Sequence, residues 1–380
     1  MPRAALWRQL RPLDRVLRAA ERTIALTERT RPLNLLEEQR RVLVAWQHGH
    51  RVEPRWTYAA SPDLGDLSDL LESLSARFEG VGVWGELYLD RVAELLLEAE
   101  LVRQINTAMF RGLAECRYGA GEPSAAACAA TWAERWLGET SGPSEHLHLS
   151  DDDGDPESLL SALRRIVGAR RLPVRVEVRA DLLSVAAATE EQIFVRPGVW
   201  LRERDVVRIV AHEIDGHVVP RLRARGRSPG LFVLGTARAE DEEGRALAIE
   251  QTTAGFDTHR RRELAWRHQA ALTVRSGASW VDTVDWLLDH EAPLDMAVLL
   301  ATRCHRGGGL AREIVYLPAL ARFLDAGGLS GAIDDWMSMG RIGIDAAGRL
   351  AQLGTERDAL RASEGLQLQT WLGVLDAESM

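Results

Sequence analysis

Two histidines and a glutamate stand close together in the segment HEIDGH at residues 212–217. His212 and His217 are five residues apart, and Glu213 follows the first histidine directly. Two neutral imidazoles can hold a zinc ion and leave a coordination position open for water, whose pKa the ion lowers towards ~7. A neighbouring carboxylate can take a proton from that water and pass it to a leaving amine. The segment therefore predicts a hydrolytic zinc site with Glu213 as the general base.

The spacing of these histidines is longer than the four residues of the familiar HExxH pattern of zinc peptidases. On a straight α-helix, five steps of about 100° would place the two side chains roughly 140° apart. A local π-turn, or unwinding at the helix end, would bring them back together. Gly216 makes such a distortion sterically easy, and we expect Pro220 to end the helix soon afterwards.

A third ligand, usually a carboxylate in a hydrolase, must come from elsewhere in the chain. The segment RAEDEEGRALAIEQTTAG at residues 238–255 is typical of a helix with an acidic first turn, and such turns also occur where no metal binds. Glu243 and Glu250 share one helical face, so position alone does not choose between them. The acidic candidates are Glu240, Asp241, Glu242, Glu243 and Glu250.

The elements around these residues follow from hydrophobic periodicity. A helix is predicted to begin near Glu203, and an alternating strand over residues 173–180 precedes it. Residues 184–195 predict two short strands around a turn. The first of these strands, 184–189, is either a core strand or a free sheet edge that can pair with an extended peptide. The arginine run at 260–262 is interpreted as a solvated helix face.

The chain divides into two predicted regions. Residues 1–157 form a helical N-terminal region that we expect to wall a cleft, and residues 158–380 form the catalytic region. The polar, Pro- and Gly-bearing segment at 141–157 marks the boundary. Its aspartates do not have the spacing of an EF-hand calcium loop.

Composition narrows the classes of function. The 380 residues carry a net charge of −9, which gives no electrostatic basis for binding nucleic acid. The three cysteines are far apart and include no CxxC pair, which favours a reducing compartment. Because no apolar run is long enough for a signal peptide or a membrane span, we expect a soluble, cytoplasmic protein. Lysine is absent from the chain, which excludes lysine-based catalysis.

Together these segments resemble a known family, the tubulin tyrosine carboxypeptidase or MATCAP-like zinc peptidases and their bacterial relatives. That family carries HEIGTH, an acidic-Glu-Gly-Leu-Ala run, Arg-x-x-Arg-Gly followed by Tyr-Leu, and an upstream Asn-Pro-x-Phe-x-Tyr. The corresponding segments of this chain lie in the same order over roughly residues 50–325, as HEIDGH at 212–217, EEGRALA at 242–248, RCHRG at 303–307, VYL at 315–317 and EPRWTY at 53–58.

The resemblance implies an α+β, mostly helical, zincin-like fold with a small β-sheet. It also implies Zn²⁺ held by His212, His217 and Glu243, with Glu213 catalytic, and removal of the C-terminal residue of a peptide or protein. The chain departs from the family pattern at Asp215 and Gly216, which replace Gly-Thr, and at Arg245, which interrupts Gly-Leu-Ala. Tubulin specificity is therefore not carried over.

The remaining candidate residues concern the substrate. Arg303 and Arg306 could grip a terminal carboxylate in a bidentate manner, although Arg303 could equally belong to a structural ion pair. Tyr316 could donate to a developing oxyanion or be a buried structural tyrosine. The alternatives are a zinc endopeptidase or aminopeptidase, and a metal-stabilised binding protein without turnover. Glu213 argues against the last, since a purely structural zinc site needs no base.

Overall fold

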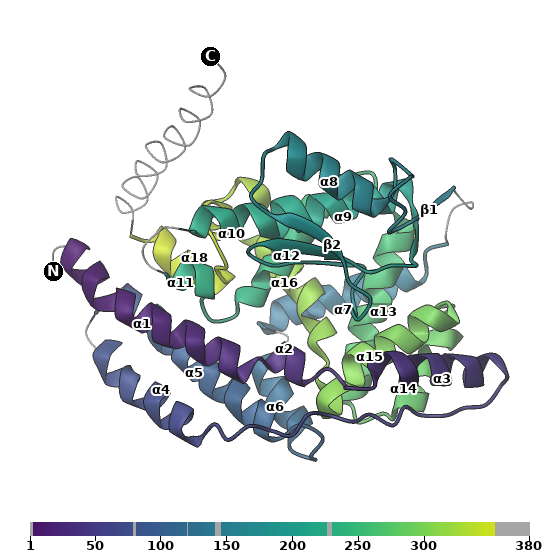
Figure 1. Cartoon of the computed structure of the whole chain (residues 1–380), viewed down its shortest axis with the longest axis horizontal. Coiled ribbons are helices and arrows are strands. Elements are labelled where there is room, and N and C mark those ends of the chain that lie inside the picture. Colours follow the sequence, from purple (N-terminus) through teal and green to yellow (C-terminus); the bar gives the residue numbers. More distant parts are fainter. Residues whose placement is uncertain (1–2, 79–80, 120, 141–145, 226–229, 354–380) are drawn as a thin grey trace.

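The computed structural model describes residues 3–353 except 79–80, 120, 141–145 and 226–229. Helices make up most of this part, and short strands form two small sheets (Figure 1). This confirms the predicted α+β, mostly helical class, whereas the zincin-like arrangement remains a prediction. The first residues of the predicted boundary segment, 141–145, and the end of the predicted catalytic region, 354–380, lie outside the described residues.

The described part of the N-terminal region is mostly helical. Asp14 on the first helix accepts hydrogen bonds from the Tyr88 hydroxyl at 2.5 Å and the Gly230 amide at 3.0 Å, which ties distant segments together. In Figure 1 the first, fourth and fifth helices lie side by side. The helices are α1 (Arg3–Ile24), α2 (Leu26–Arg29), α3 (Leu35–Gln47), α4 (Gly65–Phe78), α5 (Val83–Arg103), α6 (Phe110–Arg117) and α7 (Pro123–Leu137).

Five short strands follow, interrupted by α8 (Leu159–Ala169). One sheet pairs β1 with β5 antiparallel, and the other has the order β2-β4-β3, with β2 parallel and β3 antiparallel to β4. The strands predicted within 173–180 and 184–195 are thereby confirmed. The bounds are β1 (Leu147–Leu149), β2 (Arg175–Val178), β3 (Ala186–Ala188), β4 (Gln192–Val195) and β5 (Trp200–Arg202).

The three-stranded sheet has two different faces. Ala186, Ile193 and Val195 pack in a hydrophobic cluster with α8 and the helix that follows β5. Because side chains alternate along a strand, Ala187 and Phe194 point to the opposite face, where they line a large cleft.

The helix that follows β5 carries the candidate histidines. As predicted, α9 (Glu203–Ala211) begins at Glu203, and the π-turn is also confirmed, as the π-helix η1 (His212–Val218). The prediction that Pro220 ends the helix is wrong, because the chain continues as α10 (Val219–Ala224). Since η1 runs directly into α10, Pro220 lies inside a continuous helical run and removes one backbone donor there.

The remaining described residues are mostly helical, and several of their helices pack against η1 or against one another. In particular, α12 packs against η1 on one side and against α16 on the other. The elements are α11 (Leu231–Leu234), η2 (Ala239–Asp241), α12 (Glu242–Glu250), α13 (Thr258–Arg275), α14 (Trp280–Asp289), α15 (Leu294–Gly309), η3 (Arg312–Val315), α16 (Tyr316–Asp325), η4 (Gly328–Ser330), α17 (Ala332–Met337) and α18 (Ile344–Ala351).

One large hydrophobic cluster joins described helices from α1 to α18. It contains Leu17 and Tyr88 from the N-terminal region together with Leu247 and Phe323 from the catalytic region. The division at residue 157 therefore remains a prediction about organisation along the sequence. None of the described helices is long and apolar enough to cross a membrane.

Gly244 allows α12 to touch the backbone of α16, and this contact can be tested. An ideal Cβ on Gly244 would lie 2.3 Å from the carbonyl carbon of Ala319. We expect Gly244→Ala to lower the free energy of unfolding by roughly 1–3 kcal/mol, measured by urea denaturation. In Gly112→Ala the new Cβ meets nothing within 4 Å. That control should be slightly stabilised, and equal stability of the two variants would contradict the prediction.

Candidate active site

The π-helix brings both candidate histidines to one point. The Nε2 atoms of His212 and His217 lie 3.2 Å apart. On α12, Glu243 places its Oε2 at 3.4 Å from the first of these atoms and 3.7 Å from the second. A tetrahedral zinc ion with bonds of about 2.0–2.1 Å keeps its ligands about 3.3–3.4 Å apart. These three residues, the metal-ligand group found among the described residues, thus have spacing that suits zinc.

The charges around the group favour a cation. Burial alone would lower the pKa of His217, but the carboxylates of Glu242 and Glu243 raise it to about 10. Burial would likewise raise the pKa of Glu243, yet its contacts with His212 and His217 hold it well below the usual value. Buried carboxylates that stabilise positive charge on imidazole would stabilise a divalent ion at the same place.

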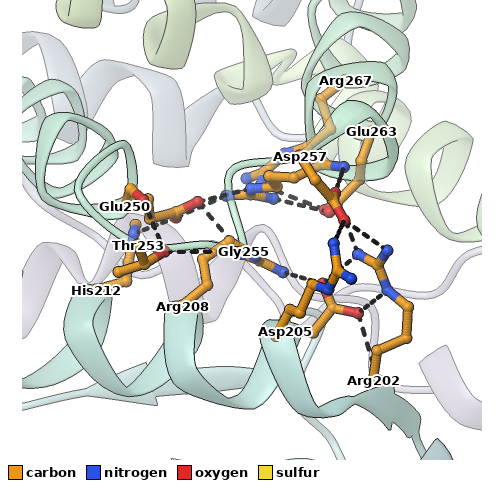
Figure 2. Close-up of polar contacts among 12 residues, drawn as sticks. Arg202, Asp205, Arg208, His212, Glu250, Thr253, Gly255, Asp257, Glu263 and Arg267 are labelled. Carbon is orange, nitrogen blue, oxygen red and sulfur yellow. Dashed lines mark hydrogen bonds and ion pairs between the residues drawn. The ribbon is translucent and has the colours of Figure 1, made fainter. Parts of the chain in front are cut away.

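A buried carboxylate contacts Nδ1, the ring nitrogen of His212 that faces away from His217. This Nδ1 lies 2.7 Å from Oε1 of the fully buried Glu250. Glu250 is in turn paired with Arg260 at 2.8 Å. It also pairs with Arg208 at 3.4 Å, and Figure 2 shows it between His212 and Arg208. Such a carboxylate fixes the tautomer and the orientation of a metal-binding histidine. Glu243 and Glu250, which sequence could not separate, therefore contact opposite nitrogens of His212.

The other acidic candidates have different partners. Glu242 lies 3.5 Å from Nδ1 of His217 and 3.0 Å from Arg221, so it supports the second histidine less closely than Glu250 supports the first. The remaining two, Glu240 and Asp241, bind the structural arginines Arg117 at 2.5 Å and Arg322 at 3.0 Å.

Glu213 lies beside the two histidines in the wall of the cleft and is only 6% exposed. Its Oε2 has no hydrogen-bond partner among the described residues. A buried carboxylate oxygen without a partner is uncommon. Glu213 thus places a carboxylate oxygen without a described partner beside the two candidate histidines.

The cleft has a volume of about 1710 Å³ and receives side chains from both predicted regions. Leu26 and Arg31 come from the N-terminal region, and Phe194 and Tyr316 from the catalytic region. An ion pair of 2.5 Å joins Arg31 to Asp181, which follows β2. The N-terminal and catalytic regions are therefore in direct contact at the cleft.

The two candidate substrate arginines have different surroundings. Arg303 donates to Glu313 at 2.7–2.9 Å, which is the structural ion pair that sequence left open. Arg306 is only 7% exposed and has no carboxylate partner in the described part of the chain. Burial lowers the pKa of its guanidinium to about 10, and Arg312 and Arg303 add to this shift. Both candidates line the cleft.

Tyr58 holds the backbone that carries Arg306, a contact that sequence reasoning missed. The backbone leaves helical geometry at Arg306, and Gly307 has a φ of +73°. The Gly307 amide donates to the Tyr58 hydroxyl at 2.8 Å. The segments EPRWTY and RCHRG therefore meet in space. The run of three glycines after Arg306 was the available signal, since it permits such a turn.

Tyr316 is buried under the guanidinium of Arg267, which lies 3.9 Å from the centre of its ring. Burial and the nearby charge of Glu243 both raise the pKa of Tyr316. Its hydroxyl is therefore protonated at neutral pH and can donate a hydrogen bond.

A series of ion pairs along α13 connects charged residues that line the cleft. Arg260 contacts Glu263 at 2.8 Å, Glu263 contacts Arg267 at 3.8 Å, and Arg267 contacts Glu313 at 2.6 Å. Since Glu250 contacts His212 and Glu313 contacts Arg303, the series runs from one candidate ligand to one candidate substrate residue. The predicted solvated face at 260–262 is wrong, because Arg260 and Arg262 are buried in ion pairs.

The contact behind His212 gives a prediction about metal affinity. We expect Glu250→Gln to weaken zinc binding by about 10–100-fold, because the amide orients the imidazole less strongly than a carboxylate does. The affinity would be measured by competition with a chromophoric chelator. Glu263→Gln is the matched control, since Glu263 also pairs with Arg260 but does not contact a histidine. Equal affinities in the two variants would exclude this role for Glu250.

The family model described as microtubule-associated tyrosine carboxypeptidase matches residues 46–367, which is most of the chain. Comparison with curated proteins and with solved structures gives no match. The resemblance to this family that the sequence segments indicated is thereby confirmed. The chain belongs to the microtubule-associated tyrosine carboxypeptidase family, which is a family of peptidases.

Proposed function

We propose that this protein is a zinc-dependent carboxypeptidase that releases the C-terminal residue of a peptide or protein. Membership of a carboxypeptidase family supports the reaction class. The spacing and charge of the three candidate ligands support the metal. The observation that carries the exopeptidase specificity is Arg306, a buried cation at the cleft without a carboxylate partner among the described residues.

The candidate ligands would be His212, His217 and Glu243. Bound zinc would polarise the scissile carbonyl and acidify a water molecule. Glu213 would take the proton of that water and deliver it to the leaving amine. Tyr316, whose raised pKa keeps its hydroxyl protonated, would donate to the oxygen on which negative charge develops.

Arg306 would hold the terminal carboxylate of the substrate. A buried guanidinium without a counter-charge is unfavourable, and a bound carboxylate would supply that charge in bidentate geometry. Arg303 is already engaged by Glu313 and would contribute charge beside it. An internal peptide bond brings no carboxylate to this position, so the arrangement favours a carboxypeptidase over an endopeptidase or an aminopeptidase.

The backbone of the substrate would lie along β3. This strand is an edge of the described three-stranded sheet, and residues 185–189 line the cleft. An extended peptide can add to such an edge through main-chain hydrogen bonds. The three cysteines are free, which is consistent with our proposal that the protein works in the cytoplasm.

Glu213 separates catalysis from metal binding. We expect Glu213→Gln to keep its zinc and to lose turnover by on the order of 10²–10⁴, because the amide keeps the shape but not the basicity. Release of C-terminal residues would be followed by mass spectrometry at matched zinc content. Glu203→Gln, at the exposed start of α9, should behave like the wild type. Equal rates in the Glu213 variant and the wild type would refute the proposed role.

Arg306 can be tested with peptides that differ only at their C-terminus. The wild type should cleave free-acid peptides and reject the amidated versions. We expect Arg306→Met to raise KM for the free-acid peptides by roughly 10–150-fold, the value of one charged hydrogen bond. The exposed Arg165→Met serves as control. Equal cleavage of free and amidated peptides by the wild type would instead indicate an endopeptidase.

A further inference from the structure

The carbonyl of Asp215 cannot obtain the backbone partner that a π-helix would give it. In η1, the amide of Val219 donates to the oxygen of Ile214, five residues earlier. The next bond of this series would run from residue 220 to the oxygen of Asp215. Residue 220 is proline, which has no amide hydrogen. The π-helix therefore needs a donor from another element at this point.

Arg245 on α12 supplies that donor. Its Nη1 lies 2.8 Å from the oxygen of Asp215, and its Nε lies 2.7 Å from Oδ1 of Asp334 on α17. The side chain is 10% exposed, so both contacts are largely screened from water. Arg245 stands two residues after Glu243 and thus connects the helix of the carboxylate ligand to the turn of the histidines.

The other two departures from the family pattern belong to the same contact. A Cβ on Gly216 would lie 2.7 Å from the Cβ of Ala246, so only glycine lets α12 come this close. The side chain of Asp215 turns away from α12 and pairs with Arg170 at 2.5 Å. Asp215, Gly216 and Arg245 are therefore one local arrangement of η1 against α12.

The hydrogen bond from Arg245 to the Asp215 carbonyl also favours the π-helical over the α-helical hydrogen-bonding pattern in η1. In an ordinary α-helix the oxygen of Asp215 would accept the amide of Val219, four residues later. That register would satisfy the carbonyl, but it would turn His217 roughly 140° away from His212. With Arg245 in place, the carbonyl is satisfied in the π register and the amide of Val219 stays with Ile214.

We propose that Arg245 is a positioning residue for the metal centre, which replaces the bond that Pro220 cannot make and thereby keeps His217 beside His212. The proposal rests on the three ligands of the proposed function. It assigns no contact between Arg245 and the metal or the substrate.

The test is a cycle of variants at the two positions. Arg245→Leu should weaken zinc binding by about 10–100-fold, as loss of other outer contacts of a metal site does. Pro220→Ala alone should change the affinity less than threefold. In the double variant, the new amide at residue 220 can bond to the oxygen of Asp215. Its zinc affinity should therefore be at least fivefold higher than that of Arg245→Leu. The affinities come from chelator competition, and the spectrum of bound Co²⁺ reports the ligand geometry.

Two controls separate positioning from general stability. Asp334→Asn removes the ion pair of Arg245 but not its bond to the carbonyl, so it should lower the unfolding temperature and leave zinc affinity unchanged. If Arg245→Leu does not fold, Arg245→Met replaces it, with the same expected loss, because methionine has no hydrogen-bond donor. Wild-type affinity in either Arg245 variant would overturn the proposal, as would a double variant that binds zinc no better than Arg245→Leu.

A metal-free measurement keeps the two proposals distinguishable. Without metal, the amides of residues 216–219 should exchange hydrogen faster in Arg245→Leu than in Asp334→Asn, because the π-helix loses its external donor. If the wild type binds no zinc, the proposed function fails, while this exchange comparison still decides whether Arg245 holds the turn. Equal exchange in the two variants would refute that role.

Discussion

The constraint on which this site depends is that two histidines five residues apart must reach the same point. A regular α-helix cannot satisfy it, and the chain meets it by opening one turn into a π-helix. The cost of that opening explains the surroundings. The glycine at 216 admits α12, the arginine at 245 bonds a carbonyl of the turn, and α12 then delivers Glu243 beside the two imidazoles.

Buried charge holds the resulting geometry. Each ring nitrogen that faces away from the candidate metal position lies near a carboxylate, and each of those carboxylates is paired with arginine. Because the chain has no lysine, every such counter-charge is a guanidinium. Guanidinium can bind two oxygens of one carboxylate, and it stays protonated even when it is buried. The charged groups behind the site therefore form fixed pairs rather than mobile surface contacts.

Sequence predicted the parts of the site that depend on local spacing. The π-turn followed from the interval between His212 and His217, and the start of α9 and the short strands followed from periodicity. Sequence failed where the answer lay in contacts between elements. Glu243 lies near Nε2 of His212 and Glu250 near Nδ1, and this difference in position separates their roles. At Pro220, a hydrogen bond from Arg245 to the Asp215 carbonyl replaces the missing backbone bond, and the helix continues. The burial of Arg260 and Arg262 was not predicted, because their carboxylate partners, Glu250 and Glu291, lie outside the helix that carries these arginines.

The ion pairs along α13 join charged residues that line the cleft into one electrostatic unit. His212 stands at one end and Arg303 at the other, and each intermediate charge contacts both of its neighbours. Coupling between two ligands that bind at different places on this unit is thermodynamically reciprocal, which is known as heterotropic linkage. An anion that settles near Arg303 and changes the affinity for a cation near His212 must have its own affinity changed by the same factor. Occupancy of the cleft and occupancy of the ligand group are then two readouts of a single coupled equilibrium.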